Sequence, residues 1–404
     1  MASTGPTTRF DVAVVGAGLA GLACARALCR EGLDVLLVDR KDDISRAVHT
    51  TGIFVRRTLE DFDLPKDCLG PPIREVTLHS PARRPLCLTS VRDEFRLGRM
   101  GALYDRLLLH CLNAGVRWSP ATRLSGVEPE GAGSRVRLST RGRAWAATAR
   151  CVVGADGVSS ATARALDLSV NTRWIAATED VFRGIPLDGP PRFQCFLDPA
   201  LAPGYLAWIV HDGEEVHLGL GGAPSRFDVL DALERFRAEA EKKLDFSRAH
   251  LVERRGGAIP VGGVLPRIAS GQGLLVGDAA GAVSPLTAGG LDGTLRLTAR
   301  AVRVILRHLG GDASAFRDYD GRKLRKRFRL RLAMRAAMDA ITSQSLLELG
   351  CFLLRRTPLQ ALARQIFFGE GLFPSLLGSP SCGDDRCRRT TGRRCLCGST
   401  CWGS

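Results

Sequence analysis

The stretch DVAVVGAGLAGLACARAL, residues 11–28, followed by DVLLVDR, residues 34–40, decides how this chain folds. The apolar run 12–15 predicts a buried parallel strand, and the Ala- and Leu-rich run 19–30 predicts a helix. A second apolar run, 35–38, predicts a second strand. This β-α-β order is typical of a Rossmann-type parallel sheet with helices on its faces.

The glycines and the acid of this unit have a spacing that ligand chemistry explains. Gly16 permits the tight turn after the first strand, Gly18 lets backbone N–H groups approach a pyrophosphate, and Gly21 lets the helix pack close to the strand. Asp39 ends the second strand where a carboxylate meets a ribose hydroxyl. A glycine-rich core turn would not explain Asp39, so we predict a dinucleotide site. Its predicted residues are Gly16, Ala17, Gly18, Gly21, Asp39 and Arg40.

Two later segments repeat the pattern of an apolar strand that stops at a glycine turn with an acid. They are CVVGADGVSS, residues 151–160, and GLLVGDAAGAVSPLTAGG, residues 273–290. Asp156 and Asp278 are their acids, and ligands of open α/β sheets bind at the carboxyl ends of strands. We therefore expect three strand ends, far apart in sequence, to converge on one cleft that holds a long cofactor.

The segments between these motifs predict antiparallel structure. Residues 74–79 and 85–90 alternate around a short turn and predict a hairpin. Residues 173–253 alternate again and carry many aromatics, among them Tyr205 and Trp208, before and around a helix expected at 229–244. Such a sheet suits the wall of an apolar ligand site, although each aromatic taken singly is equally explained as ordinary sheet core.

Length and composition favour a globular protein with two domains. The chain has 404 residues, of which 45% are hydrophobic, enough to bury a large core. Its apolar runs are too short to cross a bilayer. Residues 1–9 lack an apolar segment of signal-peptide type, so we expect a loose leader and a cytoplasmic protein.

The formal charge of +15 is concentrated near the C-terminal side. Thirteen basic and three acidic residues lie between 296 and 335. Leu324, Phe328 and Leu332 recur at helical spacing within this region and predict an apolar stripe. The basic helix expected at 322–335 is therefore either a solvated face or a contact with a membrane surface. No nucleic-acid recognition motif accompanies the charge, so nucleic acid is not an expected partner.

The cysteines predict buried thiols rather than a disulfide framework, because most of the 13 lie in core-like segments of a chain without a signal peptide. The spacing of the last five lacks the paired CxxC knuckles of common zinc sites, so no metal is predicted. These five crowd a tail that we expect to be disordered: Cys382, Cys387, Cys395, Cys397 and Cys401.

Together the three glycine segments resemble the FAD-dependent oxidoreductases of the para-hydroxybenzoate hydroxylase fold, over residues 10–340. That family combines GxGxxG and an acid with a DG motif, matched here by GADG at 154–157, and a GD motif, matched by GDAA at 277–280. The resemblance implies FAD as cofactor and NAD(P)H as electron donor. Within the family, GDAAG at 277–281 and the GYLAW segment at 204–208 are similar to the geranylgeranyl reductase branch. HTTGI at 49–53 departs from the Cys-Gly-Glu-Gly-Ile stretch of those reductases.

The resemblance also assigns roles to residues of this chain. Asp39 would hold the adenosine ribose, Asp278 the hydroxyls on the flavin side, and Asp156 would shape the cleft. Arg99 would reach the FAD phosphates. The turn from Pro285 through Gly289 to Gly290 would present backbone N–H groups to the flavin ring, with Gly277 at the preceding strand end. Tyr205 and Trp208 would line the substrate pocket.

Three functions stay open at this point. The first is a reductase that adds hydride and a proton to an alkene of a small hydrophobic or lipid-like substrate. His49 is its candidate proton donor, because imidazole titrates near neutrality and its loop is expected to face the flavin; a structural histidine is the alternative. The second is an FAD- and NAD(P)H-dependent monooxygenase, a hydroxylase or epoxidase. The third is a non-catalytic flavin-binding electron carrier.

The expected organisation follows from these motifs. The FAD-binding domain takes residues 10–172, with a hairpin insert near 73–98, and continues at 266–340. A substrate-binding β domain takes residues 173–265. Helices at 341–380 either close a lipid-facing groove or cap the core, and residues 381–404 form the Cys-rich tail.

Overall fold

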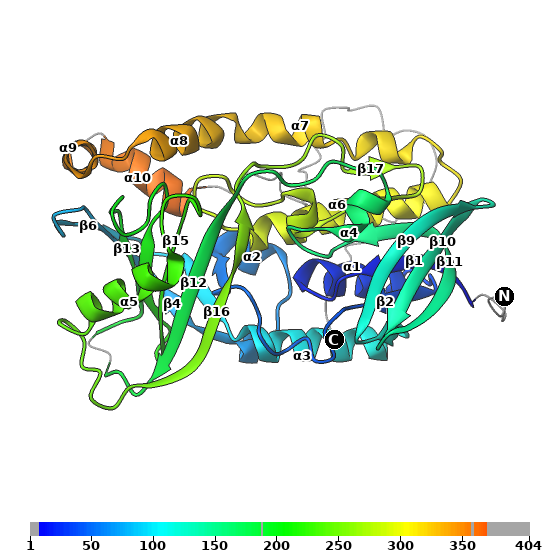
Figure 1. Ribbon diagram of the computed structural model, residues 1–404, viewed down its shortest axis with the longest axis horizontal. Coiled ribbons are helices and arrows are strands. Elements are labelled where there is room, and N and C mark those ends of the chain that lie inside the picture. Colours follow the sequence, from blue (N-terminus) through cyan, green and yellow to red (C-terminus); the bar gives the residue numbers. More distant parts are fainter. Residues whose placement is uncertain (1–7, 187–188, 357–358, 370–404) are drawn as a thin grey trace, which may run out of the picture.

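The computed structural model describes residues 8–186, 189–356 and 359–369. It contains an eight-stranded, a seven-stranded and a three-stranded sheet. Figure 1 shows the eight-stranded sheet with α1 at one end of the molecule, the seven-stranded sheet with α5 at the other, and α6, α7 and α8 along one side of both. Parallel and antiparallel sheets thus occur in one mixed α/β protein, and the predicted fold class is confirmed.

The eight-stranded sheet is built on the predicted β-α-β unit. β1 (Thr8–Val15) and β2 (Val35–Val38) pair in parallel, and α1 (Leu19–Arg30) connects them. The whole of β2 is buried, as its unbroken apolar run predicts. The other strands are β8 (Arg117–Ser119), β9 (Thr122–Glu130), β10 (Gly133–Thr140), β11 (Arg143–Gly154), β17 (Ala269–Ser270) and β18 (Gly273–Leu275).

The register of this sheet brings the three glycine segments together. Val15 of β1 lies opposite Val38 on one side and Gly154 on the other, and Gly154 lies opposite Leu275. Because these strands are parallel, the residues that follow them emerge at the same edge. The predicted convergence of three strand ends is therefore confirmed.

Helices cover this sheet on the side of α1. α1 packs between α3 (Met100–Asn113) and α6 (Leu291–Leu309) and buries small Ala, Gly and Cys side chains, which allow close approach. The short α4 (Ala161–Ala165) contacts β9 and β11. Another short helix, α2 (Arg56–Asp61), contacts α6 and β3 (Ile53–Val55).

The seven-stranded sheet forms the second half of the molecule, in the order β16-β12-β15-β14-β13-β5-β6. Its strands are β5 (Glu75–His79), β6 (Pro85–Thr89), β12 (Trp174–Arg183), β13 (Arg192–Phe196), β14 (Ala207–His211), β15 (Glu215–Gly222) and β16 (His250–Pro260). One face is covered by α5 (Val229–Ala240), which packs on β12 and β15. The small sheet β3-β7-β4 adds β4 (Leu69–Ile73) and β7 (Phe95–Gly98).

The antiparallel hairpin predicted near 73–98 belongs to the second large sheet. β5 and β6 do form an antiparallel hairpin, but β5 also pairs in parallel with β13. Val76 and Leu88 of this hairpin are buried in the core of the second half. Its backbone and side chains therefore belong to the seven-stranded sheet, not to the nucleotide-binding half.

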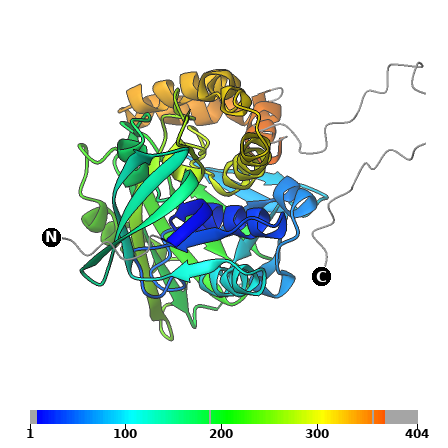
Figure 2. The ribbon, with the colours of Figure 1, turned by 90° about the vertical axis from the view of Figure 1, so that its right-hand side faces the viewer.

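Four C-terminal helices lie on the side of α6. They are α7 (Gly321–Arg325), α8 (Arg329–Ala340), α9 (Gln344–Leu354) and α10 (Leu359–Phe368). Figure 2 shows them at the opposite side of the molecule from α3. The expected membrane-facing stripe of this region is interior: Leu324 and Phe328 are buried in the main core and Leu332 packs against it. This stripe is therefore satisfied within the protein, whereas Leu330 and most of the charged side chains of 322–329 face solvent.

Eight of the cysteines lie in the described ranges, and all of these are free. Six of them are buried, as predicted, while Cys87 is exposed and Cys29 is half-buried. Of the leader expected at 1–9, Thr8 and Arg9 instead begin β1. Its other residues and the Cys-rich tail lie outside the described residues. Among the described helices, none combines the length and the hydropathy that a bilayer-crossing segment needs.

Candidate active site

A cavity of about 1290 Å³ runs between the two large sheets. Its volume exceeds the roughly 300–1,000 Å³ of common ligand pockets, so it has room for a long cofactor and a substrate. One end is lined by the glycine segments. The other is lined by the seven-stranded sheet together with residues of α8, α9 and α10.

In the loop after β1, two positions have no room for a side chain, so glycine is required there. Gly16 has φ +103°, and a Cβ there would lie 2.3 Å from the Ala155 carbonyl oxygen. A Cβ on Gly21 would lie 1.7 Å from the carbonyl oxygen of Gly16, so the helix contacts the turn directly. A Cβ on Gly18 would meet no atom within 4 Å, and Gly18 lines the cavity. Gly18 thus leaves open space beside an uncapped helix N-terminus, which suits a phosphate group.

Asp39 fastens the second strand end to this loop. Its Oδ2 accepts a hydrogen bond from the Ala17 N–H at 2.7 Å, and its Oδ1 accepts one from the Lys41 N–H at 2.8 Å. Asp39, Ala17 and Arg40 all line the cavity. The carboxylate keeps further lone pairs for a ribose hydroxyl while it fixes the loop.

Asp156 also lines the cavity, but its carboxylate is occupied by its own turn. Oδ1 accepts a hydrogen bond from the Ser160 hydroxyl at 2.5 Å. Oδ2 accepts bonds from the Thr162 N–H at 2.9 Å and hydroxyl at 3.0 Å. The contribution of Asp156 is therefore the shape of the turn that begins α4.

Asp278 is the acid whose carboxylate is free to accept hydrogen bonds from a ligand. It lies in the single helical turn Gly277–Ala280 and lines the cavity, and its carboxylate accepts no bond from the side chains or backbone of the described residues. Burial raises its pKa to about 6. A ligand with hydroxyl donors at this position would satisfy this carboxylate, which fits the ribityl chain of FAD.

A second uncapped helix N-terminus faces the same cavity. α6 begins after Gly290, which supplies no side-chain cap, and both Gly289 and Gly290 line the cavity. Three of the predicted cofactor residues do not line the cavity, and one of them is Gly21, which packs against Gly16. Pro285 is absent from the cavity lining, and the guanidinium of Arg99 pairs with Glu214 outside it.

Tyr205 and Trp208 both line the substrate end. The Tyr205 hydroxyl donates to the carbonyl oxygen of Thr287 at 2.7 Å, which connects the second sheet to the glycine turn before α6. The Trp208 indole N–H donates to Oε2 of Glu179 at 2.7 Å. Both rings are therefore held in place by buried hydrogen bonds.

Glu179 is a functional candidate that our sequence reasoning missed. It is a buried carboxylate on the cavity wall whose Oε2 also accepts a bond from the Thr51 hydroxyl at 2.6 Å. Its Oε1 lies 3.3 Å from His217 Nδ1 and 3.6 Å from Arg255 Nη1. Burial raises the pKa of Glu179, but the contacts with His217, Thr51 and Arg255 outweigh burial and hold that pKa below its ordinary value. The sequence did carry a signal, since two acids interrupt the apolar strand at 179–180.

His49 is exposed and lines the rim of the cavity. A Cβ on Gly257 would lie 3.7 Å from the Cβ of His49, so the two backbones approach closely there. Partial desolvation of the imidazole, followed by the charge of Lys41, lowers the pKa of His49. At neutral pH this histidine is therefore mainly uncharged.

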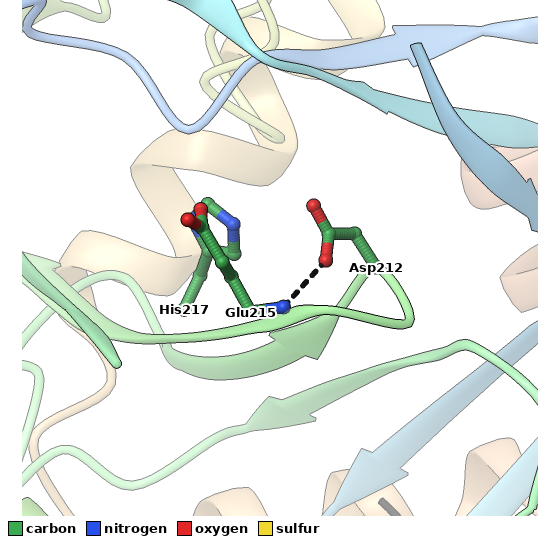
Figure 3. A group of neighbouring side chains, drawn as sticks. All are labelled: Asp212, Glu215 and His217. Carbon is green, nitrogen blue, oxygen red and sulfur yellow. Dashed lines mark hydrogen bonds between the residues drawn. The ribbon is translucent and has the colours of Figure 1, made fainter. Parts of the chain in front are cut away.

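Asp212, Glu215 and His217 form a cluster next to Glu179, shown in Figure 3. One ligand atom from each lies within 4.8 Å of the others. Glu215 is already paired with Arg183 at 2.6 Å, and Oδ1 of Asp212 accepts the Glu215 N–H at 2.7 Å. Because Arg183 occupies the Glu215 carboxylate and a turn N–H occupies the Asp212 carboxylate, we assign no metal to this cluster.

Comparison with known proteins agrees with this geometry. Residues 11–66 match the model of the FAD dependent oxidoreductase family. The chain is also similar to relatives named as digeranylgeranylglycerophospholipid reductases. The digeranylgeranylglycerophospholipid reductase of Methanosarcina acetivorans is 28% identical, with 70% of this chain and 71% of the relative covered. That of Methanothermobacter thermautotrophicus is 29% identical, with 70% and 74% covered.

Solved structures show how widely the fold of this chain is shared. A geranylgeranyl bacteriochlorophyll reductase-like protein of Thermoplasma acidophilum superposes with a TM-score of 0.78 at 19% identity, covering 90% of this chain and 98% of that one. The p-nitrophenol 4-monooxygenase of Pseudomonas putida has a TM-score of 0.64 at 16% identity, covering 91% and 95%. At these identities the likeness concerns the fold alone.

Proposed function

We propose that this FAD-dependent oxidoreductase reduces carbon–carbon double bonds of an isoprenoid lipid, with NAD(P)H as the electron donor. The observation that carries the proposal is the two-part cavity. Its glycine-lined end fits FAD, and its other end is an apolar wall made by the sheet and the C-terminal helices. The relatives named as reductases of a digeranylgeranyl lipid support this substrate class.

In this proposal, different residues bind the cofactor at one end of the cavity and align the substrate at the other. When bound and reduced by NAD(P)H, the flavin would supply hydride to one carbon of the double bond while a proton reaches the other. The loops after β1 and β18 hold the cofactor, with Asp278 accepting hydroxyl donors. The sheet and helices exclude water and align the alkene.

Glu179 acts in this proposal as a positioning residue. Its pKa lies below the ordinary value, so at neutral pH it is a carboxylate and not an acid. Its bonds to Thr51 and Trp208 fix two groups that line the same cavity. For His49, the sequence-based candidate for proton delivery, the lowered pKa leaves little of the protonated form at neutral pH, which favours the alternative of a structural histidine.

A monooxygenase on a similar substrate is the second candidate, favoured by the shared fold with p-nitrophenol 4-monooxygenase. The deciding experiment uses FAD-loaded protein reduced without oxygen by NADPH or NADH. A digeranylgeranyl phospholipid is then added, and flavin reoxidation and product mass are followed. Reduction adds two hydrogens for each double bond. No reoxidation without oxygen, with a gain of one oxygen atom when air is admitted, would replace the reductase by the monooxygenase.

The remaining parts of the proposal concern location. A cytoplasmic protein in contact with a membrane surface suits a lipid substrate. The basic segment 322–335 can attract an anionic surface through its exposed charges, but its apolar stripe is used inside the protein. Contact with the bilayer interior therefore requires a different surface.

A further inference from the structure

The outer face of α9 and α10 is unusually apolar for helices at a protein surface. Six large apolar side chains there are between 40% and 54% exposed: Leu346, Leu349, Phe352, Leu353, Leu359 and Leu362. The first four recur at helical spacing along one side of α9. A surface helix normally presents polar residues outward, and contiguous exposed apolar patches mark interaction sites.

The inner face of the same two helices is apolar as well. Leu347 and Leu354 of α9, with Ile366 and Phe367 of α10, line the cavity. Phe367 and Phe368 also pack against the core of the seven-stranded sheet. α9 and α10 are thus a single helical layer between the substrate end of the cavity and the exterior, apolar on both sides.

The charges around this layer fit a negatively charged partner. Residues 341–369 contain one acid, Glu348, and three arginines, Arg355, Arg356 and Arg364. Glu348 is itself neutralised, because its Oε1 lies 3.5 Å from Arg355 Nη2. Segment 322–329, which the length of α8 separates from α9 (Figure 1), also carries exposed basic side chains. Apolar residues beside basic ones are the pattern of a helix that lies in the interface of an anionic membrane.

We propose that α9 and α10 dock on an anionic lipid bilayer and form the wall through which a lipid substrate enters the cavity. The entry step rests on the proposed function, whereas docking itself does not. A long apolar chain would then pass from the bilayer into the cavity without crossing water, which avoids exposing its hydrocarbon surface. The bilayer is the one partner that accounts for the apolar face, the basic surroundings and the cavity behind them together.

The test compares two matched pairs of substitutions in the full-length, FAD-loaded protein. L346Q/L349Q removes two leucines, each 54% exposed, from α9. L109Q/L112Q removes two leucines, 50% and 45% exposed and equally spaced, from α3 on the other side of the molecule. Glutamine preserves helix propensity, so both variants are expected to fold.

Binding is measured by flotation with vesicles of phosphatidylcholine, with and without phosphatidylglycerol. We expect the wild type and L109Q/L112Q to float with the anionic vesicles, and L346Q/L349Q to bind at least about tenfold more weakly. Added salt should weaken wild-type binding, because the arginines act through screened charges. Absence of wild-type binding, or equal binding of both variants, would overturn the docking surface.

Two further measurements separate this proposal from the others. Light scattering on a sizing column tests whether the face joins two copies of the chain; a dimer that L346Q/L349Q converts to a monomer assigns the face to self-association instead. Turnover of substrate dispersed in detergent tests the proposed function without a membrane. If the protein binds vesicles but shows no such turnover, the proposed reductase function is rejected and the docking surface is retained. If it turns over the substrate but does not bind vesicles, only the docking surface is rejected.

Discussion

The two ends of the cavity are built by different means. At the cofactor end the decisive contacts join backbone segments, which can approach closely because Gly16 and Gly21 have no side chain. At the substrate end they are made by side chains from segments far apart in the sequence, as in the cluster of Glu179, Trp208 and Thr51. The first construction leaves a motif in the sequence, because only glycine fits. The second leaves almost none, because many residue types can fill a wall.

From this comparison we predict that a side chain added at the cofactor end disrupts folding or FAD binding. We expect Gly21→Val to prevent folding or FAD retention, since its Cβ alone would lie 1.7 Å from a backbone oxygen and overpacking of even flexible sites costs about 1–3 kcal/mol. Gly18→Ala meets no atom; it should fold and bind FAD about tenfold more weakly. Flavin absorbance per mole of protein and circular dichroism measure both. A fully FAD-loaded Gly21→Val protein would contradict this account of the loop.

At the substrate end the prediction is a loss of turnover with FAD retained. Glu179→Gln keeps the shape of the side chain but removes the charge that faces Arg255 and His217. We expect Trp208 and Thr51 to be misplaced as a result, and turnover to fall about tenfold or more. Glu253→Gln is the matched control, because Glu253 also pairs with Arg255, at 2.8 Å, but does not line the cavity. Steady-state kinetics and flavin content are the measurements. Equal effects of the two substitutions would remove Glu179 from its positioning role.

Asp278 lies where the two ends meet, and its carboxylate should oppose folding in the absence of FAD. Burial raises its pKa from 3.8 to about 6. The folded protein therefore binds this proton more tightly than the unfolded chain, and stability from this group falls as pH rises from about 4 to about 6. Asp278→Asn should raise the melting temperature of FAD-free protein by several degrees near neutral pH and little below pH 4, while weakening FAD binding several-fold. Thermal melts across pH test the sign, and a lower melting temperature of the variant near neutral pH would contradict it.

The smallest effect is expected at the rim. His49→Gln should change turnover by less than about twofold, because a histidine with a lowered pKa is mostly neutral near pH 7 and exposed to solvent. The pH profile of turnover is the relevant measurement. If the variant instead loses most of its turnover, and with it the decline of wild-type turnover as pH rises through the pKa of His49, then His49 is the proton donor.

The nucleotide-binding half was largely predictable because its signals are local. α1 spans Leu19–Arg30, as expected from composition, and the glycine spacing located the turn. The substrate half was predictable only as a class of structure. β5 pairs with β13, more than a hundred residues later, and no local pattern specifies such a partner. The apolar stripe at Leu324 and Phe328 was visible, but only packing decides whether a stripe faces a core or a membrane.

The sequence by itself indicated three glycine turns at the ends of buried strands, and in the first of them a Cβ at Gly16 or Gly21 would strike backbone. Tertiary structure alone decided that Glu179 faces Thr51, that Arg99 turns away toward Glu214, and that α9 and α10 present apolar side chains on both sides. The physical reason is that steric exclusion acts within a few residues of the chain. Burial and ion pairing depend on which distant segments come to lie side by side.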